Sequence, residues 1–170
     1  MDWDDDDEDF NFDYDSLSPE EKEEIERDMR EKDEKLHNHP LYKKAEDIFD
    51  TVHAFIECLD GDMKEMYGST LMESAMMLAP KFSGAFGSES YLICMQNASI
   101  MRYHAAYLLT STFDMDAFGE IKKTDEKYIK LLHDDMLEFQ KLFKEWVHTF
   151  DSLENEGIED EWGLYKRKPY

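Results

Sequence analysis

The chain has 170 residues, and its 42 Asp and Glu residues against 19 Lys and Arg residues give a formal charge of −23 at pH 7. This acidic excess argues against a general nucleic-acid or anionic-membrane binder, because both of those surfaces are polyanions that attract basic proteins. With 41% hydrophobic and 14% aromatic residues, the chain still has enough apolar material for a folded domain.

The sequence lacks the usual features of secreted, disulfide-bonded and membrane-spanning proteins. Its two cysteines, Cys58 and Cys94, are too few for a disulfide framework or a zinc site. The N-terminal MDWDDDDEDF has neither the basic nor the apolar region of a signal peptide, and no run approaches the roughly 18 apolar residues of a membrane span. We therefore expect a protein of the reducing cytoplasm.

The first 36 residues are predicted to form an acidic arm. They contain 18 acidic and 5 basic residues, so like-charge repulsion should keep the first 17 or so unfolded. Acidic segments with spaced aromatic residues can bind basic, apolar grooves of partners, so the arm is a candidate binding segment as well as a solubilising tail. Its aromatic residues are Trp3, Phe10, Phe12 and Tyr14. Ser18 and Pro19 then predict an exposed helix over 18–36.

Residues 40–153 contain the predicted folded domain. Leu41 to Leu59 carries apolar residues at alternating spacings of three and four, which predicts a core-facing helix that ends at Asp60 and Gly61. A second helix should start with Asp62 as its cap, and Pro80 should kink it. Residues 83–88 then read as a turn.

The second half of this domain contains two more predicted helices. The third covers about 88–111, and Thr112 to Lys123 reads as a connecting loop. A fourth begins at residues 124–126 and carries the clearest heptad pattern of the chain, which is typical of bundle packing. The heptad residues are Ile129, Leu132, Met136, Phe139, Phe143, Trp146, Phe150 and Leu153. The fold class is therefore expected to be all-α, an up-down four-helix bundle with an irregular tail at 154–170.

Two groups of residues in this bundle are candidate functional positions. The second helix is apolar on nearly all sides, which predicts that it is covered on more than one side, by neighbouring helices or by another copy of the chain. The candidate oligomer interface consists of Leu71, Met72, Met76 and Met77. On the third helix, Asn97, Arg102 and His104 interrupt an apolar pattern and are candidate buried polar residues.

No catalytic, cofactor-binding or metal-binding constellation is found, and we expect no enzymatic activity. Four-helix bundles can hold two metal ions through Glu-x-x-His motifs, and Asp50 with His53 and Glu145 with His148 have that spacing. The heptad places Glu145 and His148 on the outer face of their helix, however, and Asp50 and His53 face away from the apolar stripe of theirs. A metal or small-ligand site therefore remains the third and least favoured reading.

The order of motifs resembles a known family. Tyr42-Lys43-Lys44-Ala45 opens the first bundle helix, Tyr67-Gly68 precedes Pro80 in the second, and Thr124-Asp125-Glu126-Lys127-Tyr128 opens the fourth. Over residues 42–150 this pattern is similar to the four-helix-bundle proteins encoded in intervening sequences of bacterial large-subunit rRNA genes. The resemblance implies an up-down bundle that assembles into rings, commonly pentamers, without established enzymatic activity.

Two departures from the family argue against transferring the nucleic-acid role of its relatives, the accessory proteins of retroelements. The family's Ile-Pro-x-Asn-Ile-Ala-Glu-Gly stands here as APKFSGAF over residues 79–86, and the basic surface is missing. The leading hypothesis is a self-associating protein that acts through protein contacts. The alternative is an adaptor or nucleic-acid mimic whose acidic arm binds a basic partner.

Overall fold

The structure is a computed structural model that describes residues 14–117 and 126–153, and every regular element in these ranges is helical. The all-α class predicted from the sequence is therefore confirmed for the described residues. The chain divides into two compact units, Met1–Lys35 and Leu36–Tyr170, which are described separately below.

The first unit contains a short 3₁₀ turn, η1 (Tyr14–Ser16), and most of helix α1 (Pro19–Asn38). A reciprocal capping box starts α1: the Glu21 amide donates to Ser18 Oγ at 3.3 Å, and the Ser18 amide donates to Glu21 Oε2 at 2.8 Å. These hydrogen bonds with Ser18 lower the pKa of the Glu21 carboxyl. No residue of α1 is buried, although Leu36, near its C-terminal end, is half-buried against the core of the second unit, to which it belongs.

Helices α2 (Pro40–Cys58) and α3 (Gly61–Ala85) open the second unit. His39 caps α2, because its Nδ1 accepts a hydrogen bond from the Leu41 amide at 3.1 Å. Asp60 caps α3 by accepting from the Met63 amide at 3.1 Å. The prediction that Asp62 caps this helix is wrong, because Asp62 already lies within it. Asp60 has the extended backbone that an N-cap requires. Gly61 is accordingly the first residue of α3.

The predicted boundaries of the next two segments are also wrong. Helix α3 contains Pro80, as predicted, but it continues to Ala85, so residues 83–85 of the predicted turn are helical. The chain then turns through Gly87, whose φ of 73° lies in the left-handed region. Helix α4 (Tyr91–Ala117) extends beyond the predicted end at 111. Thr112 sits within it because the Thr112 hydroxyl donates to the Leu108 carbonyl at 2.8 Å, and the side chain continues the buried stripe of the helix.

Helix α5 (Glu126–His148) is followed by a 3₁₀ turn, η2 (Thr149–Ser152). Of the eight heptad residues, Phe143 and Leu153 are half-buried and the other six are buried, which confirms the predicted core face. Residues 124 and 125 of the predicted cap, and the tail at 154–170, lie outside the described residues.

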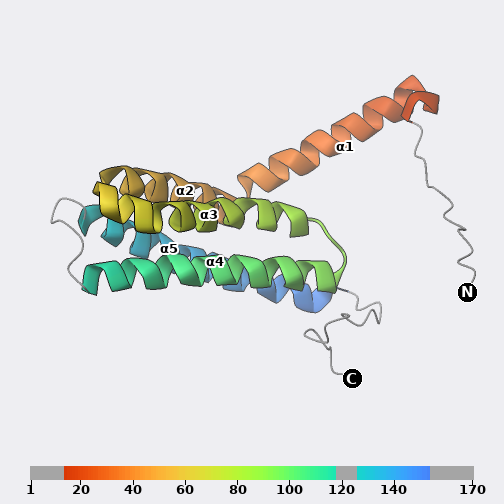
Figure 1. Cartoon of the computed structure of the whole chain (residues 1–170). Coiled ribbons are helices and arrows are strands. Elements are labelled where there is room, and N and C mark those ends of the chain that lie inside the picture. Colours follow the sequence, from red (N-terminus) through yellow and green to blue (C-terminus); the bar gives the residue numbers. More distant parts are fainter. Residues whose placement is uncertain (1–13, 118–125, 154–170) are drawn as a thin grey trace, which may run out of the picture. The chain divides into compact units, whose positions relative to one another are not determined.

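The core of the second unit lies between four helices (Figure 1). Helix α2 packs on α3 and α5, and α4 packs on the same two helices. The central side chains are large and fully enclosed, among them Phe55, Phe82 and Phe139. Near one end, the Trp146 ring meets the Phe82 ring edge to face, with centroids 5.1 Å apart.

Candidate functional site

The predicted interface residues of α3 do not share one environment. Met76 is 56% exposed, and Met72 and Met77 are half-buried. Leu71 is fully enclosed in the core of its own chain, with 0% exposure. The prediction that Leu71 belongs to an interface between copies is therefore wrong. Its side chain points inward because it falls on the same stripe as Ala75 and Leu78.

The structure adds exposed apolar residues that the sequence reasoning missed. These are Met66 at 66%, Ile93 at 44%, Ile100 at 36% and Tyr103 at 68% exposure. Met66 belongs to α3 and the others to α4. Together with Met76 and Met77, we call this set the α3–α4 surface.

Three contacts fix how α3 and α4 run past each other. Ser74 of α3 lies 3.2 Å from the His104 ring, and the Cys94 thiol of α4 lies 3.7 Å from the Ala85 carbonyl. A Cβ atom at Gly84 would lie 3.4 Å from Asn97 Oδ1. The helices are therefore antiparallel, and Met77 stands at the level of Ile100 and Tyr103.

Acidic residues are almost missing from this part of the chain. Residues 66–113, which cover all but the outer ends of the two helices, contain two acids, Glu73 and Glu89, out of 42 in the chain. The same stretch has two strongly basic residues, Lys81 and Arg102, so its net charge is close to zero. This imbalance was available in the sequence and could have pointed to the α3–α4 surface.

The predicted buried polar residues of α4 lie at two different depths. Asn97 is half-buried, and its Nδ2 donates to the Ile93 carbonyl at 2.9 Å within the same helix. His104 is half-buried and lies within hydrogen-bond distance of the buried Ser74 hydroxyl. Arg102 is exposed, so predicting it to be buried was wrong; it lies on the flank of α4 that faces α5.

A polar cluster joins α2 to α5. The Lys44 ammonium lies 3.1 Å from Asp135 Oδ1, 2.8 Å from Glu138 Oε2 and 3.2 Å from Asp47 Oδ2. Burial alone would lower the pKa of Lys44, but the three carboxylates outweigh that effect and raise it well above its ordinary value. Thr51 completes the cluster by donating to Asp135 Oδ2 at 3.2 Å. Every partner is satisfied, so this cluster is typical of a structural ion-pair network.

The other candidate positions from the sequence do not assemble into a site. Asp50, His53, Glu145 and His148 are all exposed. Within the described ranges, no group of three His, Cys, Asp or Glu side chains is placed to hold a metal ion. Burial raises the pKa of the Cys94 thiol, which lowers its reactivity at neutral pH.

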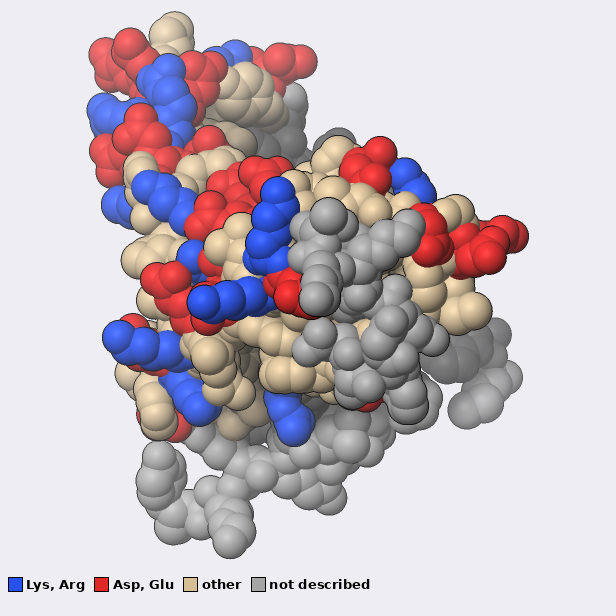
Figure 2. All heavy atoms as spheres, turned by 90° about the vertical axis from the view of Figure 1, so that its left-hand side faces the viewer, with Lys and Arg blue, Asp and Glu red and all other residues tan. Residues whose placement is uncertain are grey.

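In the acidic arm, Tyr14 is the one predicted binding residue that the structure describes. Tyr14 is 39% exposed, its hydroxyl donates to Glu26 Oε1 at 3.2 Å, and the Lys22 ammonium lies 5.2 Å from its ring centroid. Trp3, Phe10 and Phe12 lie outside the described residues. On the face that Figure 2 shows, Lys and Arg side chains lie among the Asp and Glu side chains, so the acidic charge does not form one continuous patch there.

Along the described part of the chain, no helix combines the length and hydropathy needed to cross a bilayer. Comparison with protein-family models finds no family that matches, and comparisons with curated proteins and with solved structures give no match either.

Proposed function

We propose that this chain is a non-enzymatic protein that associates with copies of itself through the α3–α4 surface. The observation that carries the proposal is the coincidence of exposed apolar side chains with the nearly acid-free stretch 66–113. Burying a large apolar side chain stabilises a contact by about 1.5–3 kcal/mol. Two copies that each carry a charge of −23 repel one another, so a surface with few acidic residues, such as this one, is where they can approach closely.

The proposal includes an up-down four-helix bundle formed by α2 to α5. Contacts between neighbouring helices support this up-down arrangement, because they pair the start of one helix with the end of the next, as antiparallel helices do. Between α2 and α3, Tyr42 lies near Phe82 and Ile56 near Gly68. The contacts of α3 with α4 follow the same antiparallel order. The sequence resemblance adds the expectation of a ring, commonly a pentamer.

Sedimentation equilibrium on the full chain at about 10–100 μM tests self-association. A monomer has a mass of 20.2 kDa, and we expect a larger species whose population rises with added salt, because salt screens the acidic repulsion. Met76→Glu and Tyr103→Glu place a charge on the α3–α4 surface and should shift the chain to monomer. Leu131→Glu is the matched control, since Leu131 is 49% exposed on α5, away from this surface.

Two results would count against the proposal. One is a wild-type chain that stays monomeric over the whole concentration range. The other is an oligomer whose population is no lower in the Met76→Glu and Tyr103→Glu variants than in the Leu131→Glu control. Far-UV circular dichroism of each variant verifies that its helices are intact, so that loss of the oligomer is not confused with unfolding.

A second candidate function rests on the first unit. Helix α1 has no buried residue and begins with acidic residues, so its acidic side chains can reach a basic partner. We infer that the acidic arm recognises a polycationic protein segment. Removing residues 1–35 should weaken the binding of a polylysine probe and reduce its salt dependence, because the arm carries 18 of the 42 acidic residues. The thermal unfolding of the remaining helices should not change. Binding with the same affinity and salt dependence would show that the arm is not the site.

A further inference from the structure

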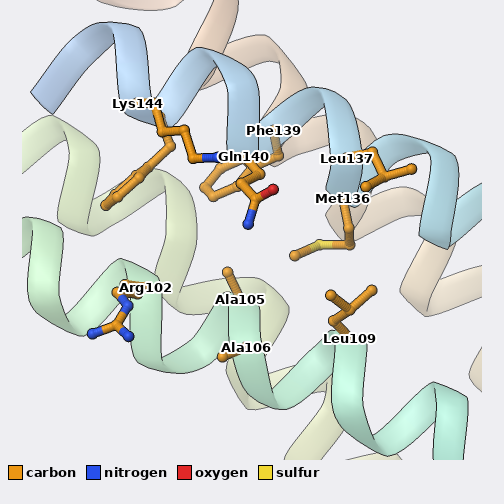
Figure 3. A pocket seen from close by; sticks show the side chains of 10 residues that line it. Arg102, Ala105, Ala106, Leu109, Met136, Leu137, Phe139, Gln140 and Lys144 are labelled. Carbon is orange, nitrogen blue, oxygen red and sulfur yellow. The ribbon is translucent and has the colours of Figure 1, made fainter. Parts of the chain in front are cut away.

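A groove of about 340 Å³ lies between α4 and α5. Figure 3 shows its two walls: Leu109 and Ala105 point from α4 toward α5, and Met136 and Gln140 point from α5 toward α4. Phe139, with 2% exposure, and Met136, with 4%, are buried, so this wall is rigid and apolar. Its volume is at the lower end of the range typical of small-molecule pockets, about 300–1,000 Å³.

The groove exists because α4 carries small side chains where it faces α5. Ala105 and Ala106 occupy successive positions there, and no large side chain of α4 fills the space opposite Phe139 and Phe143. Accordingly, α4 and α5 make the least extensive contact of the four neighbouring helix pairs. Farther along the same seam the helices do meet, since the Thr112 hydroxyl lies 3.0 Å from His133 Nε2.

The rim of the groove is cationic, which is unusual in such an acidic chain. Arg102 of α4 and Lys144 of α5 both line the groove. In Figure 3 the Lys144 ammonium lies close to the Gln140 side chain, whereas the Arg102 guanidinium lies across the groove, against α4. Among the described residues, neither Arg102 nor Lys144 forms an ion pair. None of the residues that line the groove is acidic. An anionic group at the Lys144 end would therefore meet the Lys144 ammonium and the Gln140 amide, and the exposed Arg102 side chain would have to turn toward it to add a second positive charge.

We propose that this groove binds an amphipathic anion, a single hydrocarbon chain that ends in a carboxylate. The chain would lie along Ala105, Leu109 and Met136, and the carboxylate would accept hydrogen bonds from Arg102 and Lys144. An extended peptide suits the groove less well. Its backbone would need many hydrogen-bond partners, and Gln140 is the one uncharged polar side chain in the lining. This binding site is separate from the proposed self-association, which uses the opposite flank of α4.

Isothermal titration of the full chain with decanoate, below its micelle concentration, tests the proposal. We expect binding of one decanoate per chain. Decanol has the same hydrocarbon chain without the charge and should bind at least about tenfold more weakly, because it forms no charge-assisted hydrogen bond. Decyltrimethylammonium, with the opposite charge, should not bind.

Substitutions then locate the site. Arg102→Gln and Lys144→Gln should each weaken decanoate binding several-fold, whereas Lys141→Gln, an exposed lysine of α5 outside the groove, should not. Ala106→Leu fills the groove from an exposed position and should abolish binding without lowering the melting temperature.

Three outcomes overturn the proposal. Equal affinity for decanoate, decanol and decyltrimethylammonium, or a stoichiometry well above one, would show non-specific adsorption to apolar surface. Unchanged binding by the Ala106→Leu variant would place the ligand elsewhere. Displacement of decanoate by a polyglutamate peptide of equal affinity would show a general polyanion site, in which the apolar walls have no role.

Discussion

Replacing Lys44 with Met should destabilise the second unit more than a count of its ion pairs suggests. Lys44 and Asp135 each have 13% of the side chain exposed, whereas Asp47 and Glu138 are 60% and 59% exposed. Pairs with exposed carboxylates contribute little, because water and salt screen them. The substitution matters because it leaves the Asp135 carboxylate half-enclosed without its counter-charge.

The size of the effect follows from this burial. Removing one partner of a buried ion pair costs about 3–5 kcal/mol. Here Asp135 retains the Thr51 hydrogen bond and some contact with water, so we expect the Lys44→Met variant to lose about 2–3 kcal/mol of unfolding free energy. For a chain of this size that corresponds to a decrease of about 5–10 °C in the melting temperature.

Urea unfolding followed by far-UV circular dichroism measures this loss. Lys64→Met is the matched control: Lys64 pairs with Glu57 at 2.7 Å, but both side chains are largely exposed, and we expect no measurable change. In the double variant Lys44→Met with Asp135→Leu, most of the lost stability should return, because no charge is left uncompensated.

The result that would refute this reasoning is a Lys44→Met variant within about 0.5 kcal/mol of wild type, as is usual for a surface pair. A double variant no more stable than Lys44→Met would also contradict it, since the loss would then come from packing and not from the unpaired carboxylate.

Three further predictions concern single positions. Burial lowers the pKa of His39, so its neutral ring stabilises the folded state fully above the unfolded pKa of about 6.5 and less as the pH falls through that value. The His39→Asn variant keeps a capping side chain and should flatten the decrease in the urea midpoint between about pH 7.5 and 5.5. An unchanged pH dependence would contradict this. Gly87→Ala should lower the unfolding free energy by about 1 kcal/mol, because Gly87 has a positive φ. Gly61→Ala should raise it by about 0.4–1 kcal/mol, because a Cβ atom there meets no atom within 4 Å. Equal effects of the two substitutions would show that backbone conformation does not decide the outcome. Thr112→Val should cost about 1 kcal/mol in the same assay, because it removes the hydroxyl beside His133, and a neutral result would show that this contact contributes nothing.

The fold was largely predictable because its helices are long and strongly periodic. The heptad of α5 identified its buried face, and the stripe from Leu41 to Leu59 identified that of α2. The errors lie where local polarity conflicts with tertiary packing. Thr112 looked like the start of a loop, but its hydroxyl is satisfied by its own helix and the residue is buried.

The candidate interaction surface was only partly predictable, for a different reason. Periodicity shows that α3 is apolar on several sides, but it does not show which sides its neighbours cover. Leu71 could have been excluded, because it falls on the same stripe as Ala75 and Leu78. Met72, Met76 and Met77 all lie off that stripe, and only the packing of the neighbouring helices leaves Met76 the most exposed. The exposed residues of α4 were missed because they lie off the apolar stripe of that helix and form no pattern of their own.

The contact between α2 and α5 also bears on the order of folding. Only Leu59 and Asp60 separate α2 from α3, so these helices can pair early at little cost in chain entropy. Lys44 and Asp135 are 91 residues apart and can meet only after α5 has returned to α2. Closure of the four helices is therefore a late event, and weakening the Lys44 cluster should speed unfolding while leaving the refolding rate nearly unchanged.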